Sequence, residues 1–475
     1  MATKFSKHAF QLAQQTEDIY LQLMSLSIEQ RIACICDNGD WIIKVARKAR
    51  DIAGILLLNP RLCPWLQREA RAHLFLGNLS RALDLCTEAE VQLTLAGMED
   101  SDRYLGTLDL RAQVHYLKSE YSEASELYGQ IVKKTSPSCS PLYHAHGLCA
   151  VAEMNIRMES DIADIVSSLN AAETVYLSLG SPRISLCSWL AAELKLYRGD
   201  TDNARVAFLE CLSKSRVIYP DIAGDCLAAL ADPAHKMSGP ADTFRWAVVY
   251  FVSMQKAKKP AGRLQALRRL ADVHMFMDDD ETALHLFQAA LKGGTKMGMH
   301  RLRAECMVGI GEIMLRRGDL MQAMEIWGAA HPLFVRSSRM KDAASVKNRL
   351  EMLCRKDNSH SVRAIRDGPD ESTDSVSFDF KRSESPSDAL ESSFKKLKNL
   401  SAPLTSLSLQ VEIAVEPGTS HGFPHLLLRI AGLVHVKNSG AWDTQVEDNG
   451  RGEGAWKARM CAVVPSMCGR LDNND

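Results

Sequence analysis

The chain lacks the features that mark several large classes of protein. No apolar run approaches the roughly 20 residues of a membrane-spanning helix, and the first twenty residues carry acids and glutamines where a signal peptide needs an apolar core. With 57 basic and 58 acidic side chains, there is no excess of positive charge to attract nucleic acid or an anionic membrane. We therefore expect an intracellular protein, cytoplasmic or nuclear, that binds neither nucleic acid nor membranes.

Cysteine is present, but its spacing does not indicate disulfides or a metal site. The thirteen cysteines are scattered and odd in number, as in buried thiols of a reducing compartment. The best metal candidate is the set Cys139, His144, His146 and Cys149. On a helix only His146 and Cys149 of these share a face, whereas structural zinc needs four converging ligands. We predict no metal.

Catalytic and cofactor-binding motifs are missing as well. The sequence has no Gly-x-x-x-x-Gly-Lys-Ser/Thr loop for phosphates, no Gly-x-Ser-x-Gly elbow and no His-Glu-x-x-His pair. The carboxylates are spread along the chain, so spacing selects no catalytic pair. We predict a protein that is not an enzyme and that needs no cofactor.

What the chain does have is an internal repeat of about 40 residues. A small residue recurs at intervals of 39 to 42 residues, and a second helical pattern begins twelve residues after it in five of the seven units. In the other two units the second pattern begins later, at Ile165 and at Ala247. The second pattern places an alanine, a large residue and a small or medium residue at i, i+4 and i+7, which is one face of a helix. Each unit is thus a helix A with a small contact residue, a tight turn and a helix B. The small residues are Ala70, Ala112, Ala152, Ala192, Ala231, Ala271 and Gly311.

The units resemble tetratricopeptide repeats in the stretches "YRGDTDNARVAF", "RRGDLMQAMEIWGAA", "EYSEASELYGQ" and "LGNLSRALDL". A tetratricopeptide unit usually has about 34 residues. Units of 40 are similar to the helical arrays of fungal signal-transduction NTPases (the STAND class) and of the fifth anaphase-promoting-complex subunit. HEAT and armadillo repeats have a similar period but lack the alanine–aromatic–alanine helix. The resemblance implies an all-α, right-handed α-solenoid of antiparallel helix pairs.

The tripeptide Arg-Gly-Asp occurs twice, at 198–200 and 317–319. Both copies fall between helix A and helix B of a unit. A glycine there permits a left-handed turn, and an aspartate can accept the free N–H groups that begin helix B. We interpret both copies as turns and not as cell-adhesion ligands.

We expect five regions along the chain. Residues 1–59 form N-terminal helices that include a candidate partial repeat, and 60–356 form the solenoid, with about seven helix pairs and a closing helix. Residues 357–385 are rich in serine and aspartate and predict a disordered linker. Residues 386–400 predict a short amphipathic helix, and 401–475 a poorly ordered tail in which "HLLLRIAGLVHV" could form a strand or two.

The position after each small residue of helix A carries the candidate binding site. In tetratricopeptide arrays helix A lines a concave groove, so the resemblance places this position in the groove. Carboxylates roughly 10 Å apart on neighbouring helices would attract a basic peptide or helix. In the alternative, these acids are solvated or pair with local basic residues such as Arg268, Arg269 and Arg303. The position reads Arg71, Gln113, Glu153, Glu193, Asp232, Asp272 and Glu312.

The leading interpretation is a non-catalytic protein–protein interaction scaffold that presents a concave groove to a peptide or helix of a partner. One alternative is the sensor or oligomerisation array of a STAND-type NTPase whose nucleotide-binding domain is not in this chain. Another is a subunit of a ubiquitin ligase similar to the anaphase-promoting complex. A nucleotide-binding loop in neighbouring coding sequence would favour the first alternative, and co-purification with ligase subunits the second. The sequence does not indicate an oligomeric state.

Overall fold

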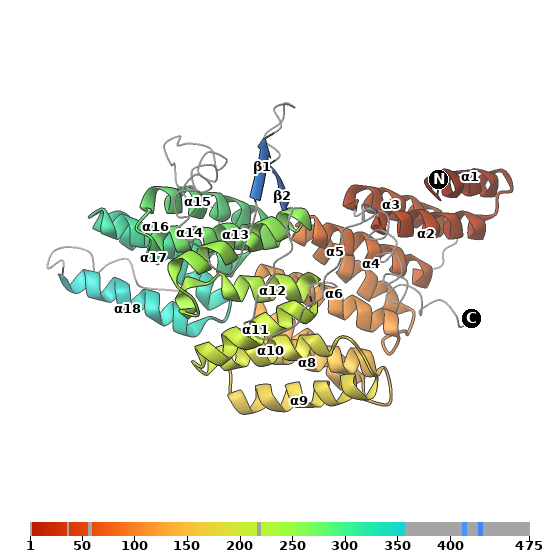
Figure 1. The fold of residues 1–475 in the computed structure, drawn as a ribbon. Coiled ribbons are helices and arrows are strands. Elements are labelled where there is room, and N and C mark those ends of the chain that lie inside the picture. The colour runs from red at the N-terminus through yellow and green to blue at the C-terminus, as the bar shows by residue number, and fades with distance from the viewer. Residues whose placement is uncertain are drawn as a thin grey trace, which may run out of the picture.

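The computed structural model describes residues 2–35, 38–55, 59–215, 220–356, 411–415 and 426–430. Within these residues the chain forms eighteen α-helices and one short 3-10 helix (Figure 1). The helices are α1 (Ala2–Gln15), α2 (Ile19–Ile35), α3 (Gly39–Ile55), α4 (Asn59–Phe75), α5 (Leu79–Leu95), α6 (Asp102–Lys118), α7 (Tyr121–Lys134), α8 (Pro141–Arg157), α9 (Ile162–Ser178), α10 (Ile184–Tyr197), α11 (Thr201–Ser215), α12 (Pro220–Leu230), η1 (Pro233–His235), α13 (Pro240–Lys256), α14 (Pro260–Phe276), α15 (Asp280–Met297), α16 (His300–Arg316), α17 (Leu320–Arg336) and α18 (Met340–Lys356).

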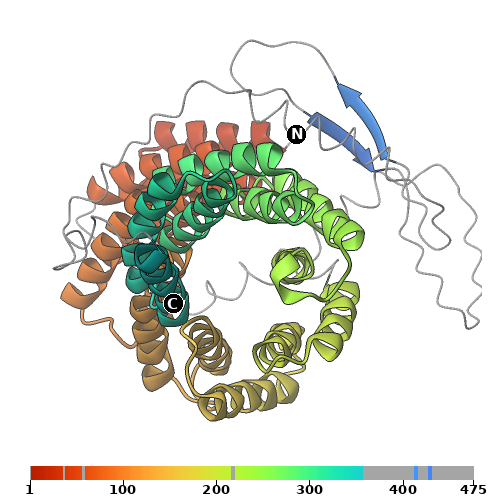
Figure 2. The same ribbon diagram turned by 90° about the vertical axis from the view of Figure 1, so that its left-hand side faces the viewer.

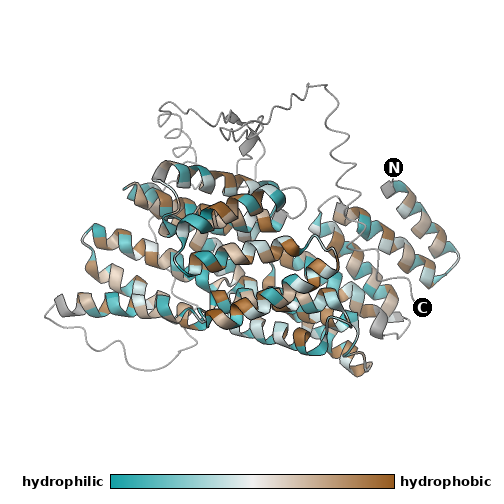
Figure 3. Cartoon of the chain, turned by 60° about the horizontal axis from the view of Figure 1, so that its bottom comes forward, coloured by the Kyte–Doolittle hydropathy of each residue, from teal (hydrophilic) through white to brown (hydrophobic). Residues whose placement is uncertain are grey.

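The helices from α4 to α17 form consecutive pairs, and α18 packs on the last of them. The predicted fold class, an α-solenoid of tetratricopeptide-like helix pairs, is confirmed. Figure 3 shows apolar and polar residues alternating around the helices, as expected of amphipathic helices that bury one face. The apolar core accordingly follows the solenoid as a series of clusters, of which one extends from Ala231 to Leu350 and another from Ala145 to Met237.

The small residues of helix A are buried and receive the large residues of helix B. A Cβ added at Gly311 would overlap the indole ring of Trp327, and one added at Gly309 would overlap the ring of Phe287. The Trp327 indole N–H also donates a hydrogen bond to the carbonyl oxygen of Val308, at 3.2 Å. The helices can approach this closely because glycine has no side chain at these two positions.

One unit departs from the expected register. Helix α12 ends at Leu230, because Pro233 follows and a proline cannot continue the helical hydrogen bonding. Ala231 and Asp232 consequently lie just beyond the helix, and Asp232 instead caps η1 by accepting the N–H of Ala234 at 3.0 Å. The prediction that these two residues continue helix A was wrong.

Both Arg-Gly-Asp copies form turns between helices. Gly199 has a φ of +81° and Gly318 a φ of +84°, in the left-handed region that favours glycine. The Asp319 carboxylate accepts the backbone N–H of Gln322, at 3.1 Å, which is the N-cap role predicted for it.

The solenoid turns through a full circle and meets itself (Figure 2). The end of α15 reaches the turn between α4 and α5, where a Cβ added at Gly77 would lie 2.7 Å from Cε of Met297. Close by, His300 Nε2 of α16 lies 3.5 Å from a carboxylate oxygen of Glu120, in the turn between α6 and α7. Helices far apart in the sequence therefore share a seam, and the inner helices of the units surround a common centre.

The tail contributes two described strands. Strand β1 (Val411–Val415) pairs antiparallel with β2 (Leu426–Ile430), with Val411 opposite Ile430. Strand β2 lies in the stretch "HLLLRIAGLVHV", where the sequence predicted a strand or two. Strand β1 was not predicted. The predicted linker 357–385, the amphipathic helix 386–400 and the rest of 401–475 lie outside the described residues. Among the helices that the structure describes, none is both long and apolar enough to cross a membrane.

A charged cavity at the centre of the ring

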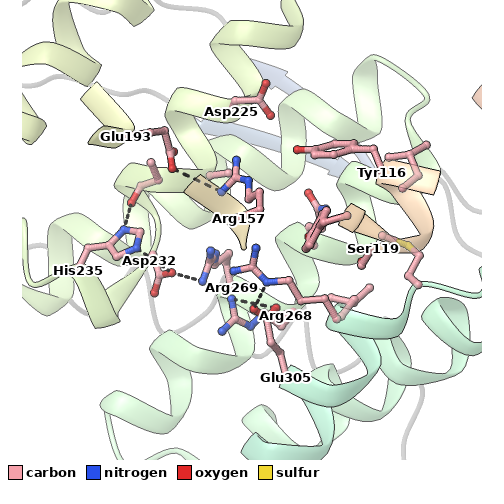
Figure 4. A pocket seen from close by; sticks show the side chains of 18 of the residues that line it. Tyr116, Ser119, Arg157, Glu193, Asp225, Asp232, His235, Arg268, Arg269 and Glu305 are labelled. Carbon is pink, nitrogen blue, oxygen red and sulfur yellow. Dashed lines mark hydrogen bonds and ion pairs between the residues drawn. The ribbon is translucent and has the colours of Figure 1, made fainter. Parts of the chain in front are cut away.

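A cavity of about 140 Å³ lies at the centre, where the two ends of the turn meet. Its lining comes from α6, α8, α10, α12, α14 and α16, which are the A helices of six successive units, and from the turn that precedes α7. Polar and charged side chains point toward one another across it (Figure 4). The superhelix therefore brings repeat positions from different units to one place.

On one side of the cavity is a group that we call the acidic wall: Arg157, Glu193 and Asp225, which line the cavity, and Glu153, which pairs with Arg157 but does not line it. Arg157 is the cation of this group and lies 3.4 Å from an oxygen of Glu153 and 3.4 Å from an oxygen of Glu193. Asp225 makes no hydrogen bond or ion pair with any other residue that the structure describes. The acidic wall thus holds three carboxyl groups for one guanidinium.

Two carboxyl groups of the acidic wall, those of Asp225 and Glu153, have raised pKa values and so a reduced tendency to ionise. Burial, followed by the neighbouring Glu153 and Glu193 carboxylates, raises the pKa of Asp225 to about 8. Burial also raises the pKa of Glu153, against the opposing effect of Arg157. Desolvation and like charge act in the same direction here, since both disfavour the ionised form. At neutral pH Asp225 therefore holds its proton for most of the time.

The opposite side, which we call the paired wall, has equal numbers of cations and anions. Arg268 Nε lies 3.0 Å from an oxygen of Asp272, Arg301 Nε lies 2.8 Å from an oxygen of Glu305, and Arg269 pairs with Asp232. Arg268 also reaches Glu305, at 3.6 Å. The members of the paired wall are Asp232, Arg268, Arg269, Asp272, Arg301 and Glu305.

Pairing controls the ionisation of two of these acids. Although burial opposes ionisation, Arg268 and Arg301 bring the pKa of Glu305 down to about 2. Arg269 likewise holds the pKa of Asp232 below its usual range against the effect of burial. Asp272 behaves differently, since burial raises its pKa to about 7 in spite of the two neighbouring guanidinium groups.

Four of the predicted groove residues meet at this cavity. Glu193 and Asp232 line it, and Glu153 and Asp272 each pair with an arginine that lines it. The position after the small residue of helix A therefore does face the centre in these four units. All four carboxyl groups have arginine partners, as the alternative interpretation proposed. For that alternative, Arg268 and Arg269 are confirmed as partners of Asp272, whereas Arg303 is buried and does not line the cavity.

The other three predicted residues lie elsewhere. Glu312 pairs with Arg349 of α18, with 3.2 Å between Glu312 Oε2 and Arg349 Nη1. Gln113 donates a hydrogen bond to Asp109, at 2.9 Å, and Arg71 is exposed on α4. In these three units the residue after the small residue of helix A lies away from the cavity. The predicted row of binding residues along one groove is therefore not continuous.

Sequence reasoning missed several members of both walls. A signal existed for three ion pairs, because Glu153 and Arg157 are four residues apart, as are Arg268 and Asp272 and also Arg301 and Glu305. Such spacing places both partners on one helix face. Asp225 had no such signal, since its surroundings come from α8 and α10.

The four residues considered for metal binding point to different partners. His144 Nδ1 lies 3.2 Å from the hydroxyl of Thr135, and His146 Nε2 lies 3.1 Å from Asp109. Cys149 lies 3.5 Å from Cys187, sulfur to sulfur, while Cys139 is exposed. In the described part of the chain, no three histidine, cysteine or acidic side chains gather as metal ligands would.

No family model and no curated protein matches this chain. Solved structures match it in fold. The Rap conjugation gene regulator of plasmid pLS20, in complex with the Phr* peptide, has a TM-score of 0.51 at 14% identity, covering 72% of this chain and 97% of its own. A Rap protein complexed with competence and sporulation factor has a TM-score of 0.43 at 12% identity, covering 69% and 98%. A STAND ATPase with a tetratricopeptide repeat sensor from Pyrococcus horikoshii has a TM-score of 0.38 at 10% identity, covering 58% and 45%.

The repeat register, the helix pairs and the likeness in fold to the Rap conjugation gene regulator agree with one another. The chain therefore has the fold of a tetratricopeptide-like helical array.

Proposed function

We propose that this chain is a non-catalytic protein-interaction scaffold whose central cavity receives a basic side chain from a peptide or helix of a partner protein. The observation that carries the proposal is the charge balance of the acidic wall, where Glu193 and Asp225 line the cavity beside one arginine, Arg157. Asp225 makes no hydrogen bond or ion pair with any other residue that the structure describes. A guanidinium or ammonium group placed beside Asp225 would favour its ionised form and form a charge-assisted hydrogen bond with it.

The size of the cavity limits what can enter. A volume of about 140 Å³ is close to that of an engineered cavity of about 150 Å³ that holds one benzene molecule. One long side chain fits such a space, whereas a whole helix does not. We infer that the partner segment lies at the mouth of the cavity and inserts a lysine or an arginine.

The likeness in fold supports a peptide as the ligand. The Rap regulator of pLS20 is described in complex with a peptide, so an array of this fold can hold one. The interpretations as the sensor array of a STAND-type NTPase or as a ubiquitin-ligase subunit stay predictions, and either role is compatible with a peptide bound in the cavity.

The test is binding of a fluorescent hexa-arginine peptide, followed by anisotropy, with hexa-glutamate as the control ligand. Asp225→Asn should weaken hexa-arginine binding about tenfold, which corresponds to about 1.4 kcal/mol. The matched control is Asp221→Asn on the same helix, because the Asp221 side chain is 70% exposed and pairs with Lys259 at the surface. Equal affinity of both variants, or a wild-type protein that does not bind hexa-arginine, would reject the proposal. Affinity capture with mass spectrometry would then identify natural partners.

A further inference from the structure

The seam between the two ends of the superhelical turn centres on one buried carboxylate. Glu120 has His115 Nδ1 at 2.7 Å and Lys118 Nζ at 2.9 Å, both from the end of α6. From far later in the chain, His300 Nε2 and Arg336 Nη2 each lie 3.5 Å from Glu120 Oε1. We call these five residues the clasp. Through Glu120, the clasp ties α16 and α17 to the turn between α6 and α7.

The clasp lies directly beside the wall of the central cavity, although its own five side chains do not line it. The residues on either side of Glu120 and of His300 line the cavity, so the backbone that carries the clasp also carries the lining. These lining residues are Ser119, Tyr121, Met299 and Arg301. Separating the clasp would therefore move one side of the cavity away from the other.

A second contact between the two ends of the superhelical turn lies next to the acidic wall. Arg339, at the start of α18, donates a hydrogen bond to the backbone carbonyl oxygen of Arg157, at 3.0 Å, and lies 3.4 Å from Glu159. Lys341 also approaches Glu159, at 3.8 Å. The segment from α16 to α18 thus contacts both Glu120, in the turn between α6 and α7, and the end of α8, where Arg157 lines the cavity.

The seam has one apolar contact, in which Met297 packs against the cluster of α4 to α6, but its clasp and its Arg339 contact differ in kind from the contacts between consecutive helices. Consecutive helices share apolar clusters, which are costly to expose to water. The clasp and the Arg339 contact consist of charged and polar groups, which water can solvate once they separate. Interfaces of this polar kind permit relative motion more readily than apolar ones.

We propose that the clasp gates the central cavity, so that separation of α16–α18 from α6–α8 admits the partner's basic side chain and reclosure holds it. The identity of the ligand rests on the proposed function, whereas the gate is a property of the fold alone. Loss of the Glu120 carboxylate would leave Lys118 and Arg336 facing each other without an anion, and their repulsion would favour the open form.

The experiment measures access to the cavity without any ligand. Ala228, on α12, lines the cavity, and Ala228→Cys places a thiol there. Its rate of alkylation by iodoacetamide is followed by peptide mass spectrometry in the full chain. Adding Glu120→Gln should raise that rate about tenfold. Adding Glu123→Gln, an exposed acid on α7, should leave it unchanged.

A second variant protects the test against unfolding. Arg336 is 55% exposed, so Arg336→Gln removes one cross-turn partner with little effect on packing, and it should raise the alkylation rate by about threefold. Circular dichroism and thermal melting establish that each variant is folded. If Arg336→Gln and every folded Glu120→Gln sample react at the rate of the Glu123→Gln control, the gate is rejected. Because no ligand takes part, this outcome is independent of the hexa-arginine result.

Discussion

The acidic wall and the paired wall arise from the inner helices of the same repeat but differ in their charge balance. The paired wall matches three carboxyl groups with three arginines, whereas the acidic wall sets three against one. The difference follows from local sequence. On α14 and α16 an arginine lies one helical turn before the acid, while no cation lies one turn from Asp225 on α12.

This difference shows that repeat register and site chemistry are separate properties. Register decides which positions face the centre. Burial and the arginines that reach a carboxyl group then decide its pKa together: the pKa is about 2 for Glu305 beside Arg268 and Arg301, and about 8 for Asp225. One arginine four positions away is not enough, since the pKa of Asp272 is raised to about 7 in spite of Arg268. Equivalent positions in a repeat therefore need not have equivalent functions.

The largest expected effect comes from breaking the paired wall. Arg269→Met would leave the Asp232 carboxylate, which is 7% exposed, without its guanidinium. His235 and the Ala234 N–H still contact this carboxylate, so we expect a loss of about 3 kcal/mol, at the lower end of the range for breaking a buried ion pair, measured as the free energy of unfolding in urea at pH 7. The control Arg263→Met, at an exposed position of the same helix, should cost less than about 0.5 kcal/mol. Equal losses for the two variants would mean that the pairing does not stabilise this wall.

The opposite change is expected on the acidic wall, with a characteristic pH dependence. Because the pKa of Asp225 is raised to about 8, the folded state binds more protons than the unfolded state between about pH 4 and pH 8. The contribution of Asp225 to stability therefore falls as the pH rises through this window. Asp225→Asn removes that loss and should raise the free energy of unfolding by about 1–2 kcal/mol at pH 8, but hardly at pH 4.

A pH series of urea unfolding for the wild type and Asp225→Asn checks this prediction. Asp232→Asn provides the contrast, since the lowered pKa of Asp232 contributes stability above its unfolded pKa, and the variant should be less stable at pH 7. A gain from Asp225→Asn that does not depend on pH would contradict the assignment.

The smallest expected change in the free energy of unfolding comes from an exposed ion pair outside the cavity, which serves as the reference for the buried pairs of the two walls. Arg317, in the second Arg-Gly-Asp copy, pairs with Glu281 at 2.6 Å, but the Glu281 side chain is 76% exposed. Exposed pairs contribute about 0–1 kcal/mol, so Glu281→Gln should change the free energy of unfolding by less than about 0.5 kcal/mol. A loss above about 1.5 kcal/mol in the same urea assay would show that distance alone, without burial, determines the strength of these pairs.

The parts of the structure that the sequence predicted well are local. Gly199 and Gly318 ended their helices as expected, because a positive φ is a property of one residue and its neighbours. The small residues were identified because a helix face has a fixed period. The misplaced end at Leu230 was also local, since Pro233 follows closely and its effect on the helix was underestimated.

The candidate site was predicted only in part. Glu193 and Asp232 could be placed near the centre from repeat register, and Arg268 and Arg269 were named as partners. The environment of Asp225 was missed, because the carboxylates that raise its pKa come from α8 and α10 and no short-range pattern connects them to it.

The sequence by itself determined the helices, their turns and the 40-residue period, since helix propensity, glycine turns and apolar faces act over a few residues. The tertiary structure alone decided that the solenoid closes, that Glu120 meets His300, and that the inner helices of six units enclose one cavity. Small rotations between successive helix pairs add up over the whole array, and their sum determines which distant residues come into contact.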